Sequence, residues 1–256
     1  MTATTMTFEQ VAAWAGVDEP TMELARACTK PRIVVSGKLA SGKDTVAVET
    51  MRILGFPDAV RVSVAEPLRK EVEAILDLSR KYEPADAIAG ISVYGRISES
   101  MAITVHAMAT RALAVNPKVT SYMRTADMRS LLQYWGTDVR IAQDPSYWIR
   151  KAIYSIFHVL ATDKAVYITD ARFVGDIDLA RSICFYALRL EVSAIVREGR
   201  LFVRDGLMLD PATENHPSER SLENYRDFDV VVDNSGPLQQ TVADIVWKLS
   251  SQPSLK

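Results

Sequence analysis

The stretch of this sequence that most clearly suggests chemistry is GKLASGKDT, Gly37–Thr45. Two glycines five positions apart, followed at once by a lysine, match the spacing of a loop that binds phosphates. Backbone N–H groups of such a loop point inward, and the next helix adds partial positive charge at its start, so a polyphosphate can be held there. Lys43 is then expected to reach the outer phosphates. The alternative is a glycine-rich turn with a surface lysine.

Asp44 stands where that kind of loop usually has a hydroxyl group. Magnesium prefers hard oxygen ligands, so a carboxylate here predicts a metal contact, made directly or through water. The alternative is an ordinary acidic residue stabilised by the helix dipole. Thr45 restores a hydroxyl one position later, suited to an inner phosphate or to helix capping. The loop side chains also expected beside the phosphates are those of Lys38, Ala40 and Ser41.

Asp170 ends the second notable stretch, the apolar run AVYITDAR at 165–172. In open parallel sheets, ligands collect at the carboxyl edge of the strands. Asp170 is therefore expected to join the magnesium shell or to fix a nearby arginine. Arg172 follows two positions later and is expected to share the same ligand.

A third stretch, at 197–220, concentrates arginines among turn-forming residues. Planar cations on a closing segment exclude water and stabilise transferring charge, so we expect a lid over the phosphates. The alternative is a solvated loop with salt bridges. His216 and Glu219 either form a functional pair on this lid or are structural. The arginines are Arg197, Arg200, Arg204 and Arg220, with Arg226 just beyond.

These residues need a scaffold, and the pattern of apolar residues predicts one. Short apolar runs separated by segments of helical periodicity indicate a parallel sheet covered by helices on both faces. The predicted strands are 32–37, 59–64, 165–172, 189–196 and 228–234. The predicted helices are two short ones within 7–29, then 43–54, a helix beginning at Glu66, most of 79–127, 128–138, 146–163, 176–187 and 238–249.

Bulk composition limits the possible partners. The 256 residues are 48% hydrophobic and carry 30 Lys and Arg against 32 Asp and Glu, which gives no net basic field to attract nucleic acid. Cys28 and Cys184 lack metal-site spacing and favour a reducing compartment. No signal-peptide pattern or membrane-spanning stretch is present, so we expect a cytoplasmic protein. Trp135, Tyr147 and Trp148 are expected in the core or in a pocket wall.

Several stretches together resemble the phage-type deoxynucleoside monophosphate kinase family of phosphate-loop kinases. Asp after the loop lysine is usual in that family, so the unusual Asp44 adds to the resemblance. The resemblance covers about residues 32–249, and the stretches that carry it are 36–45, 64–71, 131–140, 147–152, 168–181, 216–219 and 228–238.

The resemblance implies a three-layer phosphate-loop kinase fold at 31–256, with a helical insertion at 79–127 and a lid at 197–226. Residues 1–30 would be a helical extension that either caps the sheet or forms a dimer contact. ATP phosphates and magnesium would be held by Gly37, Gly42, Lys43, Asp44 and Thr45, with Asn234 near the ATP base and Arg172 near the acceptor phosphate. The acceptor pocket would use Glu66, Leu68, Arg69, Arg129, Gln133, Gly136, Thr137, Asp138 and Trp148.

The function so implied is transfer of the γ-phosphoryl group from ATP to a deoxynucleoside 5′-monophosphate, with Mg²⁺ as cofactor. We expect no nucleic-acid or membrane partner, and residence in the host cytoplasm if the chain is phage-encoded. One alternative is a related kinase of another phosphorylated acceptor, such as dephospho-coenzyme A or phosphomevalonate. A second is a nucleotide-dependent switch or ATPase. Against a GTPase switch, the sequence has no Asn-Lys-x-Asp guanine-reading motif. Against an ATPase that drives DNA, the strand end carries a single acidic residue, Asp170, where a pair would be expected.

Overall fold

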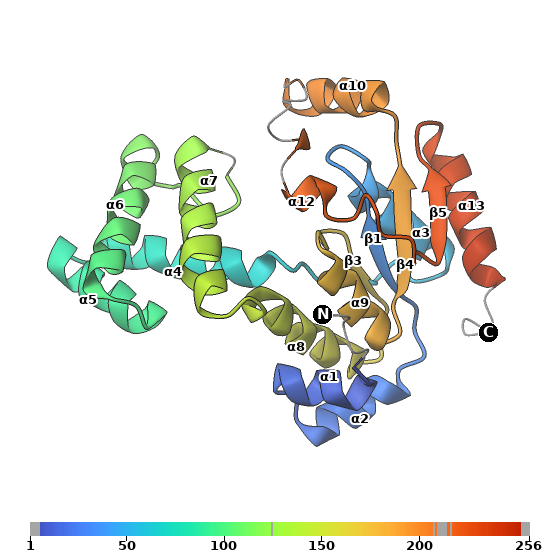
Figure 1. The fold of residues 1–256 in the computed structure, drawn as a ribbon, viewed down its shortest axis with the longest axis horizontal. Coiled ribbons are helices and arrows are strands. Elements are labelled where there is room, and N and C mark those ends of the chain that lie inside the picture. Colours follow the sequence, from blue (N-terminus) through green and yellow to red (C-terminus); the bar gives the residue numbers. More distant parts are fainter. Residues whose placement is uncertain (1–5, 124, 207, 209–213, 216, 252–256) are drawn as a thin grey trace. The chain divides into compact units, whose positions relative to one another are not determined.

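The computed structural model describes residues 6–123, 125–206, 208, 214–215 and 217–251. The chain forms two compact units. Unit 1 takes the described residues up to Val64 and from Ile153 onward, and unit 2 is Ala65–Ala152. Unit 1 contains the sheet with its helices, and unit 2 is built from helices (Figure 1). The insertion expected at 79–127 lies inside unit 2, which begins earlier and ends later.

The sheet of unit 1 has five described strands in the order β2-β3-β1-β4-β5, and every neighbouring pair is parallel. In the central register, Val34 lies opposite Ile168 on one side and Ala187 on the other. All of β1 is buried, as expected for an apolar inner strand. The predicted α/β class with a parallel sheet is confirmed. The strands are β1 (Arg32–Ser36), β2 (Val60–Arg61), β3 (Val166–Ile168), β4 (Tyr186–Glu191) and β5 (Val230–Asp233).

Helices lie on both faces of this sheet. On one face, α3 (Lys43–Ile53) and α13 (Leu238–Ser250) pack together, and their apolar residues form one buried cluster with alternate residues of the strands. On the other, α9 (Val174–Ser182) contacts β4 (Figure 1). This arrangement is consistent with a three-layer α/β fold. The cluster includes Ile33, Val35, Val46, Met51, Leu188, Leu190, Val232, Ile245 and Leu249.

The first two helices, α1 (Phe8–Ala15) and α2 (Glu19–Ala27), confirm the two short helices predicted within 7–29. They belong to unit 1, where the centroid of the Phe8 ring lies 4.9 Å from that of Phe157. The buried Arg32 donates hydrogen bonds to the carbonyl oxygens of Ala25 (3.1 Å) and Cys28 (2.6 Å) at the end of α2. A buried guanidinium thus ties α2 to the first strand.

Unit 2 confirms the predicted helical character of 79–127. The predicted helix at 128–138 is the end of α7 followed by a π-helical segment, η1. Such segments are rare and often occur at functional sites. The helices are α4 (Glu66–Lys81), α5 (Pro84–Gly95), α6 (Glu99–Val115), α7 (Ala126–Gln133) and η1 (Tyr134–Ile141), and α8 (Tyr147–Leu160) runs from unit 2 into unit 1.

The boundaries around β4 were predicted wrongly. The helix expected at 176–187 ends at Ser182. The strand expected at 189–196 begins earlier, at Tyr186, and ends at Glu191, and its last three expected residues, 194–196, belong to helix α10 (Ala194–Asp205). Cys184 has a φ of 66°, a left-handed conformation that ends the helical path before the strand. The aromatic and β-branched residues near this break fit either state, so helical spacing misled the prediction.

The first part of the expected lid is a helix and not a loop. Helix α10 (Ala194–Asp205) carries Arg197, Arg200 and Arg204, and the Ser193 side chain caps it by accepting a hydrogen bond from the Val196 N–H. A short helix, α12 (Pro217–Arg220), follows in the second part. His216 lies outside the described residues. Dense turn formers after residue 205 hid this capped helix from the sequence pattern.

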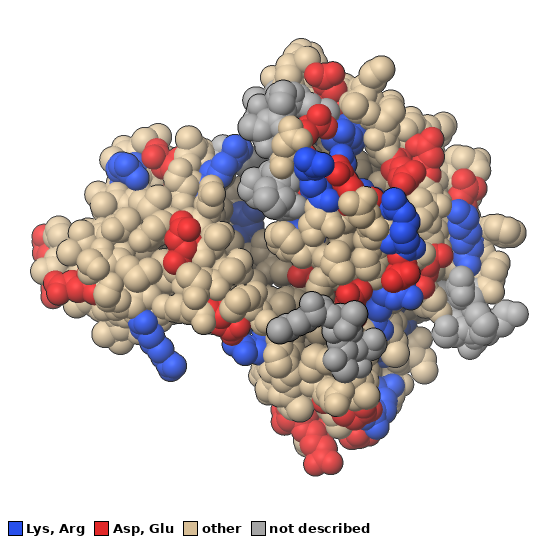
Figure 2. All heavy atoms as spheres, in the orientation of Figure 1, with Lys and Arg blue, Asp and Glu red and all other residues tan. Residues whose placement is uncertain are grey.

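Within the described ranges, every helix is too short or too polar to cross a bilayer. Figure 2 shows acidic and basic side chains interspersed over the visible face.

Candidate active site

The glycine-rich loop connects β1 to α3 through a tight turn. Gly42 has a φ of 84° and Ala40 a φ of 60°, both in the left-handed region. A Cβ atom on Gly37 would lie 2.5 Å from Ser41 Oγ and 3.2 Å from the Leu190 carbonyl oxygen. Small residues are therefore required where the loop passes β4.

Gly42→Ala should destabilise unit 1 by about 1–2 kcal/mol from the left-handed backbone alone. Crowding adds to this loss, because the new Cβ would lie 2.9 Å from Asn234 Nδ2. The matched control is Gly16→Ala, since Gly16 has a φ of 78° and a Cβ atom added there would meet no other atom within 4 Å. Urea denaturation of both variants measures the difference. Equal losses would contradict the close approach at Gly42.

The carbonyl oxygen of Ser41 is held from two other segments of unit 1. It accepts hydrogen bonds from Asn234 Nδ2 (2.8 Å) after β5 and from Arg200 Nη1 (3.3 Å) on α10. Arg200 Nη2 also donates to the Asn234 carbonyl oxygen (2.7 Å). The connections leaving β1 and β4 run toward opposite edges of the sheet, which is where open α/β sheets bind ligands. The loop is thus fixed at the topological switch point.

Two side-chain oxygen atoms in the residues that make these contacts have no hydrogen-bond partner among the described residues. They are Ser41 Oγ and Asn234 Oδ1, and both residues are buried. Buried polar atoms normally have partners, so two orphaned acceptors mark a place where a ligand or water can donate. Asn234 was expected beside the ATP base, and in the structure its amide nitrogen donates to the loop.

Lys43 begins α3 and points back along the loop, with its Nζ 3.5 Å from the Lys38 carbonyl oxygen. Burial, and after it the neighbouring charge of Arg172, lower the pKa of Lys43 to about 8. The carboxylates of Glu219, Asp44 and Asp170 act in the opposite direction on that pKa. An anion bound beside this ammonium group would favour its charged form.

The two carboxylates predicted to bind a metal, Asp44 and Asp170, are each held by residues at the ends of β2 and β3. Asp44 accepts a hydrogen bond from Thr169 Oγ1 and pairs with Arg61 Nη2 (3.2 Å). Asp170, the next residue after Thr169, accepts from Ser63 Oγ and from the Val64 N–H (3.0 Å). The ends of β2 and β3 therefore bring both acids to the start of α3.

The donor set fits magnesium only in part. Among the described residues, no three His, Cys, Asp or Glu side chains cluster as a complete metal site. Magnesium usually keeps several waters and uses one or two carboxylates together with substrate phosphates. Asp44, whose side chain is 66% exposed, suits that role.

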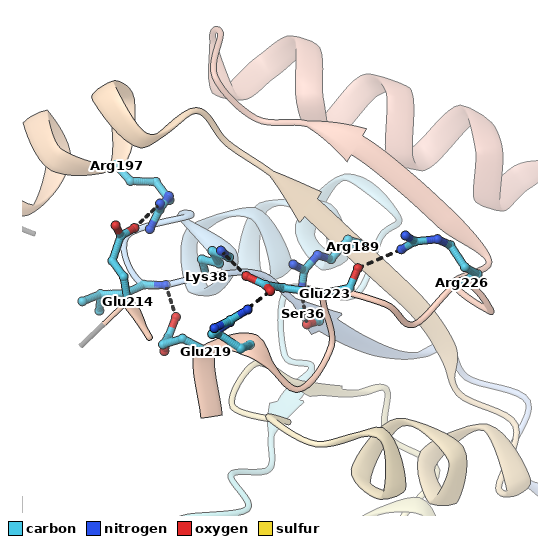
Figure 3. Close-up of polar contacts among 10 residues, drawn as sticks. Ser36, Lys38, Arg189, Arg197, Glu214, Glu219, Glu223 and Arg226 are labelled. Atoms are coloured by element: carbon cyan, nitrogen blue, oxygen red, sulfur yellow. Dashed lines mark hydrogen bonds and ion pairs between the residues drawn. The ribbon is translucent and has the colours of Figure 1, made fainter. Parts of the chain in front are cut away.

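Three carboxylates from the segment 214–223 bind cations and an amide that were predicted to meet phosphates (Figure 3). Glu219 pairs with Arg172 and accepts the Leu39 N–H of the loop at 2.7 Å. Glu223 pairs with Lys38 at 2.6 Å. Glu214 pairs with Arg197 Nη2 at 2.5 Å.

The expected lid arginines are therefore not equivalent. Arg197 is buried in its ion pair, and Arg200 holds backbone carbonyl groups. Arg204 is exposed on α10. Arg220 pairs with Glu223 at 3.3 Å. Sequence composition located this cationic segment but gave no information on which arginines were already engaged.

Apart from Arg172, which lies in unit 1, the expected acceptor residues lie in unit 2, where some are exposed and others are buried. The exposed acceptor residues on α7 and η1 lie one turn apart along one side of this helical segment, four or five residues from one turn to the next. They are Arg129, Gln133, Thr137 and Asp138. Gly136 and Trp148 are buried, and Trp148 Nε1 donates to the Gly136 carbonyl oxygen at 3.0 Å.

The remaining expected acceptor residues lie on α4. A Cβ atom on Gly136 would approach Leu68 Cδ2 at 3.1 Å, so Leu68 packs on η1. Glu66 accepts a hydrogen bond from the Tyr122 hydroxyl group at 2.7 Å. The Arg69 guanidinium stacks 5.1 Å from the centroid of the same ring and donates to the Ser121 carbonyl oxygen. Leu68 and Arg69 thus have structural contacts within unit 2.

The sequence analysis missed a buried cluster around Glu71, which we call the Glu71 cluster. Glu71 lies on α4 and accepts hydrogen bonds from four side chains, two on η1 and two on α8. These are Trp135 Nε1 (2.9 Å), Arg140 Nε (2.8 Å), the Tyr147 hydroxyl (2.5 Å) and Lys151 Nζ (3.0 Å). Its signal was present, because Glu71 shares helical spacing with the buried Val72, Ile75 and Leu76.

Charge balance explains why a carboxylate is stable at this place. Burial alone would raise the pKa of Glu71, but hydrogen bonds from Tyr147 and Lys151 and the charge of Arg140 outweigh burial, so the pKa is lowered. Arg140 also lies 4.6 Å from the Trp135 ring centroid and 4.8 Å from that of Tyr147. The Glu71 cluster therefore holds η1 on α4 and α8.

Comparisons with models of known protein families and with curated proteins found no match.

Proposed function

We propose that this protein transfers the γ-phosphoryl group of ATP to a deoxynucleoside 5′-monophosphate. The observation that carries the proposal is the loop Gly37–Gly42 at the switch point of a parallel sheet, with the partly buried ammonium group of Lys43 behind it. The phosphate-loop kinase fold is part of the same proposal. It is supported by the sheet, the helices on both faces and the loop between β1 and α3.

On the donor side, the amides at the start of α3 and the ammonium group of Lys43 would bind the outer phosphates. Asp44 and Asp170 would hold magnesium, which supplies charge neutralisation at the β- and γ-phosphates when it is bound. Thr45 is exposed in the first turn of α3, where its hydroxyl can reach an inner phosphate. Each group acts on developing negative charge, so positioning and electrostatics would supply most of the rate enhancement.

On the acceptor side, Arg172 would neutralise the monophosphate. That phosphate already carries a nucleophilic oxygen and needs little help from a base. Within unit 2, taken by itself, the exposed face of α7 and η1 carries a guanidinium, an amide, a hydroxyl and a carboxylate, which are groups that can hydrogen-bond to a nucleoside. The buried Gly136 and Trp148 would fix the backbone that carries this face, through the hydrogen bond from Trp148 Nε1 to the Gly136 carbonyl oxygen.

The direct test is an ATP-coupled assay with each deoxynucleoside and ribonucleoside monophosphate in turn, with products identified by mass. We expect at least one deoxynucleoside monophosphate to become a diphosphate. Dephospho-coenzyme A and phosphomevalonate belong in the same panel. Failure of every nucleotide to raise ADP formation above the basal level would overturn the proposal.

The pKa of Lys43 predicts how ATP binding changes with pH. Because the free protein loses this proton at about pH 8, binding of an anion must restore it at higher pH. The dissociation constant of Mg-ATP should rise by up to about tenfold per pH unit above that value. Lys43→Arg keeps its charge and should show no such rise up to about pH 9.5. Calorimetry measures both, and a flat wild-type profile would contradict the assignment.

A further inference from the structure

Glu219 joins two parts of the candidate active site that lie far apart in the sequence. Its Oε2 accepts the hydrogen bond of the Leu39 N–H (2.7 Å), 180 positions away, at the tip of the glycine-rich loop. Its Oε1 pairs with Arg172 Nη1, after β3. The carboxylate therefore bridges the loop and the arginine.

The Glu219 carboxylate is buried and fully paired in this bridge. Its side chain is only 7% exposed, whereas that of Arg172 is 34% exposed. A carboxylate so buried is stable only when both oxygens are paired, and each oxygen has its own partner here. Arg172 is held from its main chain as well, because its N–H donates to Asp176 Oδ2 at 2.8 Å.

The contact leaves part of the Arg172 guanidinium for a ligand. Only Nη1 of that group is hydrogen-bonded within the described residues. A guanidinium has five N–H donors in a fixed fork, so anchoring one nitrogen sets the direction of the others. Glu219 and Arg172 also both influence the pKa of Lys43, which places all three charges in one neighbourhood.

We propose that Glu219 is a positioning residue that fixes the Arg172 guanidinium against the tip of the glycine-rich loop before substrates bind. This inference rests on the proposed function, because Arg172 is assigned there to the acceptor phosphate. The carboxylate does not touch the reacting atoms. It sets the distance between the loop that holds the donor phosphates and the arginine that neutralises the acceptor.

The test compares Glu219→Gln with Glu49→Gln, which removes a partly exposed carboxylate of unit 1 that pairs with Arg52 (2.6 Å) and touches neither Arg172 nor the loop. Glutamine keeps the length of the side chain but loses the charge that orients the guanidinium. We expect kcat of Glu219→Gln to fall about 10- to 100-fold, with the Mg-ATP dissociation constant from calorimetry changed less than about threefold. Glu49→Gln should retain kcat within about twofold.

A double-mutant cycle separates positioning from a general loss of structure. If Glu219 acts through Arg172, then Glu219→Gln in an Arg172→Ala background should lower kcat by less than about twofold further. Additive losses would overturn the proposal. Tighter Mg-ATP binding by Glu219→Gln would also overturn it, because the carboxylate would then be competing with phosphate for the same groups.

A nuclear magnetic resonance measurement tests the bridge without turnover. The Leu39 amide signal should lie downfield in the wild-type protein, shift in Glu219→Gln, and keep its position when Mg-ATP and the accepted monophosphate are added. Loss of that signal position on ligand binding would overturn the positioning role. Absence of any wild-type turnover would instead overturn the proposed function, so the two failures are distinguishable.

Discussion

Lys43→Ala should reduce turnover by about three orders of magnitude, because it removes the ammonium group assigned to the charge that develops on the transferred phosphoryl group. The fold should survive. Among the residues that the structure describes, Lys43 makes one hydrogen bond, a long one of 3.5 Å, and its burial already disfavours the charged form, as its lowered pKa shows. We expect a melting temperature within about 3 °C of the wild type.

The measurements are kcat in the coupled assay and the Mg-ATP dissociation constant by calorimetry. Lys30→Ala is a suitable control, since Lys30 is a partly exposed lysine paired with Asp163 at 3.3 Å. It should leave both quantities nearly unchanged. If Lys43→Ala phosphorylated deoxynucleoside monophosphates at a near-normal rate, the assignment of the loop would be wrong.

Glu71→Ala should destabilise unit 2 by about 3–5 kcal/mol, because it leaves the buried charge of Arg140 without its partner. The ion pair is 2.8 Å long, and the side chains are 8% exposed for Arg140 and 6% for Glu71. Three further donors, on Trp135, Tyr147 and Lys151, would lose their acceptor at the same time. Asp77→Ala on the same helix is the control, since its pair with Arg80 is exposed and contributes about 1 kcal/mol at most.

Urea denaturation followed by tryptophan fluorescence measures this loss, since Trp135 contacts Glu71 directly. The pKa of Glu71 is lowered in the folded protein, so its contribution is present above the ordinary glutamate pKa of about 4.3 and disappears as the pH falls below that value. The difference between wild type and Glu71→Ala should therefore shrink in acid. Equal stability of Glu71→Ala and Asp77→Ala would refute the role of this cluster.

The Glu71 cluster also bears on the proposed acceptor site. It holds η1, and the exposed Thr137 and Asp138 lie on that segment. A displaced η1 would misplace these side chains, and displacements of about 1 Å are enough to lower a rate about a hundredfold. A mutation at Glu71 is thus expected to affect acceptor binding as well as stability.

Local pattern in the sequence was sufficient for much of the scaffold. Apolar runs predicted the parallel sheet, and helical spacing predicted α3, α4, α8 and α13 with small errors at their ends. These features depend on residues a few positions apart, so periodicity reveals them. The spacing Gly37, Gly42, Lys43 likewise indicated a turn from strand to helix. Periodicity failed near Cys184, where one left-handed residue separates α9 from β4.

Only the tertiary structure decided which charges meet. Arg61 and Thr169 at Asp44, Ser63 at Asp170, and Glu219 between Leu39 and Arg172 come from segments widely separated in the chain. Sequence spacing carries no signal for such pairs, because they depend on which strand ends share an edge of the sheet. The order β2-β3-β1-β4-β5 brings those ends together, and this order results from packing between segments that have no fixed spacing in the sequence.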